Sequence, residues 1–333
     1  MVRKSNQKKV NDTLPTKEGN SPNLEGKMPP LCSGTSFDGL YKTRLYAMFI
    51  RYCLLSTFVK RDISPLSAML IAPPEENKTR IMMVFLKFRT AMHPVDISMK
   101  PLVDLIQAQE EKQKIFHIII PDFIKAVYHK ASVVDAVIGT LLGLIDEGID
   151  QNLFFGQVFK LKRRVQMGLV TGITPELFRK HFRKWTENGF LTRIFPISYR
   201  YTDDTCQEIA KFISEDLPII VDDTIAKAKQ RGIREIKIGS DISAAIRILT
   251  EDVIQRLRTF SIVAYSGKKM STKSKSGYRI YFDIKGFRLQ KMLRLLIKSI
   301  AYDRGHDEAN YEDLETLREL ANLIRLPDNP REV

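Results

Sequence analysis

The stretch that most constrains the fold begins at Leu66. Residues 66–72 are apolar apart from Ser67, and such a run is typical of a parallel strand covered on both faces. A short polar loop follows, and an amphipathic run begins at Lys78 and extends to about residue 90. This order predicts a strand, a tight loop and a helix, and therefore an α/β fold with a parallel sheet sandwiched by helices.

The loop between this strand and helix has the length and the ending of a phosphate-binding loop. Such loops direct backbone N–H groups inward and end in a Lys for the phosphates and a hydroxyl for Mg²⁺. Where the pattern has glycine, this chain has Ala72 and Asn77, and Asn tolerates positive φ better than most residues. We therefore expect ATP to be bound by Ala72, Pro73, Pro74, Glu75, Glu76, Asn77, Lys78 and Thr79.

Other features of the loop are less usual for such a site. Pro73 and Pro74 lack amide donors, and Glu75 and Glu76 place negative charge beside the phosphates unless they point to water. The alternative interpretation is an ordinary strand–loop–helix crossover with an exposed Lys78.

A second apolar run ends in a carboxylate. Residues 115–120 are apolar except for His117, and Pro121 and Asp122 follow. A buried strand that delivers one carboxylate to Mg²⁺ is the second half of a P-loop site. We therefore expect Thr79 and Asp122 to bind the metal, with a helix N-cap as the alternative role for Asp122.

The composition favours a polyanionic partner. The chain of 333 residues carries a formal net charge of +14, which favours nucleic acid over other partners, although a basic protein without such a partner is the alternative. Cys32, Cys53 and Cys206 lie far apart and predict neither a disulfide framework nor a zinc site, as is typical of a cytoplasmic protein. No apolar run reaches membrane-spanning length, so we expect no membrane partner.

Later segments continue the α/β pattern and then become helical. The sequence predicts helices at 37–59, 99–113, 131–147, 174–188, 286–302 and after Asn310, strands at 93–98 and 167–174, and a hairpin at 154–165. Residues 1–35 have few large apolar groups and predict a disordered basic tail. The fold is expected to end at Pro327 and Pro330, which leaves 327–333 as a second tail.

The order of these pieces resembles the AAA+ class of P-loop ATPases, and more closely the compact AAA+-like proteins of phages, plasmids and other mobile elements. The resemblance covers about residues 60–200 and 285–325, and the last helix pair is similar to the lid of minichromosome maintenance helicases. It implies an ATPase core at 36–205 and a mostly helical lid domain at 206–326, with a basic loop at 267–279.

The resemblance also implies roles for individual residues. Asp122 coordinates Mg²⁺, Thr171 (or, second, Thr174) senses the γ-phosphate, and Arg193 reaches the nucleotide of a neighbouring subunit. Arg288 (or, second, Arg294) senses phosphate from the lid. The residues expected to carry the chemistry are Lys78, Asp122, Thr171, Arg193 and Arg288.

Each of these residues also has a plain structural interpretation. Thr171 is alternatively a satisfied strand-end hydroxyl, Arg193 a surface ion pair, and Arg288 part of a solvated helix face. The chain also departs from the family at Phe123, where a Glu that orients water is usual. Asp146 or Glu147 could replace it only if the fold brings one of them near.

Two functions follow from these expectations. The first is an ATP-binding, AAA+-like ATPase that assembles as a homo-oligomer and acts on nucleic acid, with DNA expected first, in replication, helicase or remodelling work. The second is a nucleotide-gated, weakly or non-hydrolysing DNA-binding regulator or replication accessory protein. A basic DNA-binding module without nucleotide is a third. Phosphate-backbone contacts are expected from Lys160, Lys162, Arg163, Arg164, Lys268, Lys269, Lys273 and Lys275.

Overall fold

The chain divides into two units, Met1–Gly34 and Thr35–Val333. A computed structural model describes only residues of the second unit: 43–85, 91, 92, 94, 100, 102–104, 106, 107, 116–154, 157–213, 228, 230–258, 286–328 and 330–333. The predicted tail 1–35 and the basic loop 267–279, with Lys268, Lys269, Lys273 and Lys275, lie outside the described residues, as does the side chain of Lys160.

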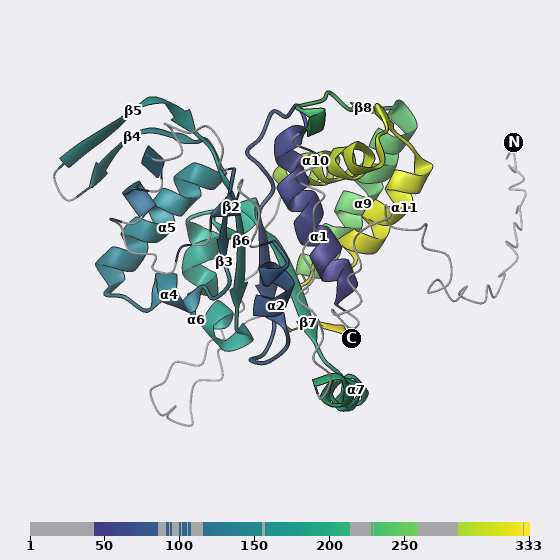
Figure 1. Ribbon diagram of the computed structural model, residues 1–333, viewed down its shortest axis with the longest axis horizontal. Coiled ribbons are helices and arrows are strands. Elements are labelled where there is room, and N and C mark those ends of the chain that lie inside the picture. Colours follow the sequence, from purple (N-terminus) through teal and green to yellow (C-terminus); the bar gives the residue numbers. More distant parts are fainter. Residues whose placement is uncertain are drawn as a thin grey trace, which may run out of the picture. The chain divides into compact units, whose positions relative to one another are not determined.

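A parallel sheet forms the centre of the described unit (Figure 1). Its strands stand in the order β10-β7-β1-β6-β3-β2, and every pairing between them is parallel. The strands are β1 (Ala68–Ile71), β2 (Ala91–Met92), β3 (His117–Ile120), β6 (Gly168–Ile173), β7 (Phe195–Arg200) and β10 (Arg331–Glu332). All residues of β1, β3 and β6 are buried, so the α/β class and the buried parallel strands predicted from the sequence are confirmed.

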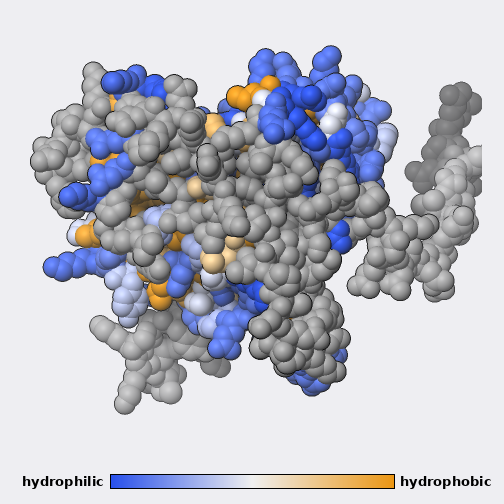
Figure 2. All heavy atoms as spheres, in the orientation of Figure 1, coloured by the Kyte–Doolittle hydropathy of each residue, from blue (hydrophilic) through white to orange (hydrophobic). Residues whose placement is uncertain are grey.

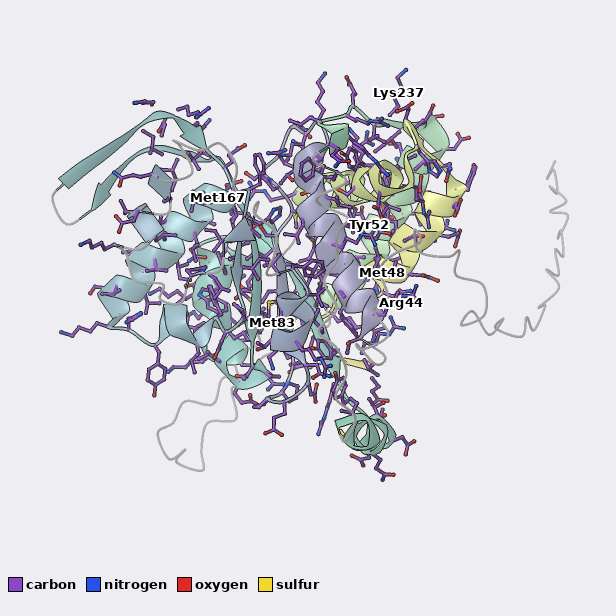
Figure 3. The ribbon with its side chains drawn as sticks, viewed as in Figure 1. Arg44, Met48, Tyr52, Met83, Met167 and Lys237 are labelled. Atoms are coloured by element: carbon purple, nitrogen blue, oxygen red, sulfur yellow. The ribbon has the colours of Figure 1, made fainter. Side chains whose placement is uncertain are left out.

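Helices cover both faces of this sheet (Figure 1). On one side lie α4 (Ile124–Val127), α5 (Ala131–Ile145) and α6 (Pro175–Glu187), and on the other lie α1 (Arg44–Leu55) and α2 (Lys78–Met83). The helices α1 and α2 contact each other and β6, whereas α5 contacts β6 and α4. Figure 3 shows Arg44, Met48 and Tyr52 following one another along α1. Between α5 and β6 the chain forms an antiparallel hairpin of β4 (Ile149–Phe154) and β5 (Gln157–Val165).

The carboxy-terminal part is mostly helical. It contains α9 (Ser240–Arg258), α10 (Phe287–Arg304) and α11 (Tyr311–Ala321), with a small parallel pair of β8 (Lys237–Ile238) and β9 (Glu308–Ala309). In Figure 2 the surface of this part around β8 and α10 is largely hydrophilic. The remaining described elements are η2 (Ser56–Phe58), η3 (Leu191–Arg193) and α7 (Asp203–Ile213).

A buried ion pair joins the helical part to the sheet domain. Nη2 of Arg51, on α1, donates to both carboxylate oxygens of Asp303 on α10, at 2.8 and 2.7 Å. Both side chains are buried, and breaking such a pair by removing one partner is strongly destabilising. The ion pair therefore holds α10 against α1.

The fold continues past the residues where the sequence predicted its end. After Pro327 and Pro330 the chain forms β10, which adds a strand to the sheet beside β7. The Val333 N–H donates to the carbonyl of Arg200, and the Thr202 N–H donates to the carbonyl of Val333, both at 3.1 Å.

Parallel pairing gives the sheet two different edges. At the carboxyl edge Ile71 pairs with Ile173 and Ile120 with Thr171, so the loop after β1 adjoins the ends of β6 and β3. The segments that precede these strands meet at the amino edge. The two edges are about 20 Å apart, the length of roughly six extended residues.

None of the helices in the described parts of the chain is long and apolar enough to cross a membrane.

Gly172 tests the packing at the carboxyl edge. A Cβ there would lie 2.7 Å from the Pro121 carbonyl oxygen and 2.8 Å from Cε of Met82, so Gly172→Ala forces the strand ends apart. We expect a loss of about 1–3 kcal/mol in the free energy of unfolding by urea denaturation. Gly139, exposed in α5 with nothing within 4 Å of an added Cβ, is the control, and Gly139→Ala should stabilise by up to about 1 kcal/mol. Equal stability of both variants would contradict this packing.

Candidate functional site

The loop after β1 has an unusual backbone. Glu75 and Asn77 have φ values of 65° and 56°, and no other non-glycine residue among those described has a positive φ. Such left-handed conformations are costly for residues with a Cβ and persist where the surroundings impose them. Left-handed residues that alternate along a turn direct successive N–H groups into one concavity that suits anions. The positive φ considered for Asn77 from the sequence is present.

Neighbouring strands hold this loop in place. The hydroxyl of Tyr199, at the end of β7, donates to the carbonyl of Glu76 at 2.6 Å. On the other side of β1, the Ala72 N–H donates to the carbonyl of Ile173 at 3.2 Å. The ring of Tyr199 packs on Tyr46 of α1, with ring centroids 4.4 Å apart. These contacts explain how the strained backbone is maintained.

Lys78 folds back over the loop. Its Nζ donates to the carbonyl of Ala72 at 2.6 Å and also to the carbonyl of Pro73. The side chain is partly buried, unlike the exposed lysine of the alternative interpretation. Burial lowers the pKa of the Lys78 ammonium, and the negative charges of Glu76, Asp122 and Glu176 act in the opposite direction. The Lys78 ammonium is therefore held by loop carbonyls and lies within electrostatic range of three carboxylates.

The two expected metal ligands lie at this same edge. Asp122 follows β3, and the Phe123 N–H after it donates to the carbonyl of Gly172 at 2.8 Å. Asp122 and Thr79 are both exposed. Asp122 Oδ1 also accepts the Ile124 N–H at 3.1 Å, but the N-cap of α4 is Phe123, so Asp122 is not the helix N-cap considered as its alternative role. The described residues contain no group of three or more His, Cys, Asp or Glu side chains placed to hold a metal.

The two threonines proposed to sense phosphate make contacts within the fold. Thr171 is buried, and its hydroxyl donates to the carbonyl of Ile120 in β3 at 2.8 Å. Thr174 is the N-cap of α6, where its hydroxyl oxygen accepts the Leu177 N–H at 3.4 Å. Thr171 thus has the contacts of a satisfied strand hydroxyl, and Thr174 is the nearer of the two to the carboxyl edge.

The two arginines implied by the resemblance lie together at the amino edge. Arg193 is in η3, just before β7, and forms an ion pair with Asp146. Nη2 of Arg288, at the start of α10, lies 3.1 Å from Oδ1 of the same carboxylate. Burial and then the charge of Arg193 lower the pKa of Arg288. Arg294, the second choice, donates to Oγ of Ser243 at 2.6 Å.

Arg193 and Arg288 line a cavity of about 680 Å³. Its charged or polar lining includes Ser64, Asp146, Arg164, Arg193, Arg288 and Lys291. Because the cavity is at the amino edge, neither arginine can reach Lys78 of the same chain. Asp146 and the neighbouring Glu147 are equally remote from Asp122, so the condition under which either could orient water there is not met.

The core explains why no carboxylate follows Asp122. Phe123 is fully buried, with its ring 6.1 Å from that of Phe190 and 5.7 Å from that of Trp185, centroid to centroid. A carboxylate at this position would lose its water without gaining a partner, which is costly. The side chain after Asp122 therefore belongs to the aromatic core under α6.

The structure places two glutamates, Glu76 and Glu176, near Lys78 at the carboxyl edge. Glu76 is partly buried, and the loss of water raises the pKa of its carboxyl to about 7, while the Tyr201 backbone and Lys78 act in the opposite direction. Glu176 is exposed in the first turn of α6. From the sequence, Glu176 is included only within the predicted helix 174–188, and its position directly after a buried strand is the signal that could have found it.

The predicted basic hairpin is present as β4 and β5. Its base is at the amino edge, because β5 ends at Val165 and β6 begins at Gly168. Lys162, Arg163 and Arg164 are exposed on β5, and Arg164 also lines the cavity.

Comparison of the chain with protein-family models and with curated proteins gives no match.

Asn77 can be tested by a pair of substitutions. Alanine at a φ of 56° is strained, so Asn77→Ala should lose about 1 kcal/mol of unfolding free energy, whereas Asn77→Gly should lose less. Urea denaturation of both variants provides the measurement. If Asn77→Ala is as stable as Asn77→Gly, the left-handed conformation at this position is not required.

Glu76 should make stability depend on pH. Because folding raises its pKa from 4.5 to about 7, the folded state binds more protons between these values, and stability falls as pH rises through this window. Glu76→Gln should therefore gain stability relative to wild type between pH 4.5 and 8, on the order of 1 kcal/mol after allowance for solvent screening. Urea denaturation at pH 5 and pH 8 measures this, with Glu75→Gln as the exposed control. The prediction would be contradicted if the unfolding free energies of Glu76→Gln and wild type differed by the same amount at pH 5 and pH 8.

Proposed function

We propose that this chain is an ATP-binding, AAA+-like P-loop ATPase that acts on nucleic acid as an oligomer. The observation that carries the proposal is the loop 72–77, whose left-handed residues Glu75 and Asn77 precede Lys78, with Asp122 at the same sheet edge. A turn with left-handed residues, a lysine after it and a carboxylate nearby are features that suit a Mg·nucleotide site.

The strand order supports a ligand at this edge. From β1 the chain crosses to β2 at the far edge of the sheet, and the later strands return until β7 pairs on the other side of β1. In open α/β sheets, ligands bind outside the carboxyl ends of the strands where the direction of the order reverses. The end of β1 is such a point.

The residues present fit a magnesium ion. Thr79 would offer a hydroxyl and Asp122 a carboxylate, and both are exposed at the carboxyl edge. Mg²⁺ usually takes only one or two protein carboxylates and keeps water and phosphate oxygens as its other ligands. A bound Mg²⁺ would neutralise negative charge on the phosphates.

The proposed nucleotide contacts of Arg193 and Arg288 require an assembly of several chains. Both arginines lie about 20 Å from the phosphate loop of their own chain, across the length of the strands. They could therefore contact nucleotide only if the amino edge of one chain faced the carboxyl edge of another. Such a head-to-tail contact generates a ring or an open helix.

The hairpin and the net charge support nucleic acid as the partner. Lys162, Arg163 and Arg164 are exposed on β5, and the whole chain has a formal net charge of +14. Basic side chains on a projecting hairpin suit the phosphate backbone, which is bound without regard to sequence.

The second candidate is a nucleotide-gated regulator that hydrolyses ATP slowly or not at all. Phe123 favours it, because the position after Asp122 is buried among aromatic rings. ATP binding is common to both candidates, and turnover separates them.

A binding experiment tests the proposed function. Saturating Mg·ATP at 100-fold above the dissociation constant should stabilise the wild-type protein by about 2.7 kcal/mol, seen as a higher melting temperature. Lys78→Ala should abolish this gain, and Lys237→Ala, a change at an exposed lysine on β8, should keep it. No nucleotide-dependent shift in wild type would contradict the proposal and favour a basic DNA-binding module without nucleotide.

A second experiment tests the hairpin. Replacing Lys160, Lys162, Arg163 and Arg164 together by Gln should weaken DNA binding and flatten the decline of affinity with salt, because fewer counterions are released. Fluorescence anisotropy with duplex and single-stranded DNA at several salt concentrations measures both effects. Unchanged affinity and salt dependence would exclude the hairpin as the contact.

A further inference from the structure

Glu176 lies beside the start of the phosphate loop. The end of β6 adjoins β1 there, because the carbonyl of Ile173 accepts the Ala72 N–H at 3.2 Å. Thr174 then caps α6, and Pro175 occupies its first position. Glu176 is therefore fixed in the first turn of a helix of 13 residues, next to the loop.

The strand order puts Glu176 on the relevant side of β1. β6 stands between β1 and β3, so the segment after β6 lies between Lys78, which follows β1, and Asp122, which follows β3. A phosphate held by that lysine and by a metal on that aspartate would lie in front of this segment. Consistent with this position, the Glu176 charge acts on Lys78.

The other carboxylates near Lys78 are less suited to activate water. Glu76 is on the β7 side of β1, where its carbonyl accepts the Tyr199 hydroxyl at 2.6 Å and its carboxyl is partly buried. Asp122 is the expected metal ligand and accepts the Ile124 N–H at 3.1 Å. Glu176 is exposed, and within the described part of the chain no hydrogen bond or ion pair is seen at its carboxylate.

We propose that Glu176 is the general base for ATP hydrolysis, taking the place of the carboxylate that Phe123 excludes. This inference rests on the proposed function. The oxygen of a water molecule forms a bond to the γ-phosphorus while the bond from that phosphorus to the β–γ bridging oxygen breaks. One proton of the water passes to the Glu176 carboxylate and later to solvent, and ADP and phosphate leave.

Glu176→Gln provides the test, because Gln keeps the size of the side chain but cannot accept the proton. Nucleotide binding, measured by the Mg·ATP-dependent melting temperature, should remain as in wild type. Turnover should fall at least about 100-fold, the lower range for removal of a general base. ATP rather than ADP should then be recovered from the protein after gel filtration. Glu187→Gln, at the other end of α6, is the control and should keep both properties.

The outcomes are distinguishable. Turnover that survives in Glu176→Gln, or that is lost in Glu76→Gln with binding intact, would overturn the role of Glu176 while ATP binding stands. Wild-type protein that binds ATP without turnover would also overturn it. Wild-type protein that binds no ATP would overturn the proposed function together with this inference.

Discussion

The parallel pairing of β1 with β6 on one side and β7 on the other is the constraint on which the rest of the site depends. Because the strands of the central sheet all run the same way, the loop after β1 meets Asp122 and Glu176 at one edge. Arg193, Arg288 and Asp146 meet at the other. An antiparallel neighbour would mix the two groups. Contacts from β6 and β7 hold the strained loop. The sheet therefore determines the conformation of this loop and also which residues lie near Lys78.

The separation of the loop after β1 from Arg193 and Arg288 is the reason that the proposed function includes an oligomer. One chain has the proposed phosphate loop at one edge and two arginines at the opposite edge, where Asp146 neutralises them in part. Asp146 follows α5 at the base of the basic hairpin, and Arg164 of that hairpin lines the same cavity. In the proposed assembly, nucleic acid on the hairpin and nucleotide on a neighbouring chain would act on one network of charges.

Much of the fold could be predicted because its signals are local. The apolar runs became β1, β3 and β6, and Thr174 with Pro175 began α6 where predicted. By contrast, the edge of the sheet at which a residue lies, and the strand that it faces, depend on the strand order and are not local signals. Thr171 occurs at a suitable place along the chain, yet its hydroxyl bonds to the neighbouring strand. Arg288 begins the expected helix, but the Arg51–Asp303 pair holds that helix against α1, and its first turn lines the amino-edge cavity. Glu176 follows a strand predicted from the sequence, but only the strand order places it between Lys78 and Asp122.

The most direct measurement of the central claim is hydrogen exchange of the whole protein with and without Mg·ATP. The account predicts slower exchange in peptides that cover residues 72–85, 120–126 and 173–178, because bound phosphates would engage the loop amides and order the adjoining strand ends. Lys78→Ala should lose this protection. Unchanged exchange across 72–85 under conditions in which ATP is bound would contradict the account, since the nucleotide would then lie elsewhere on the chain.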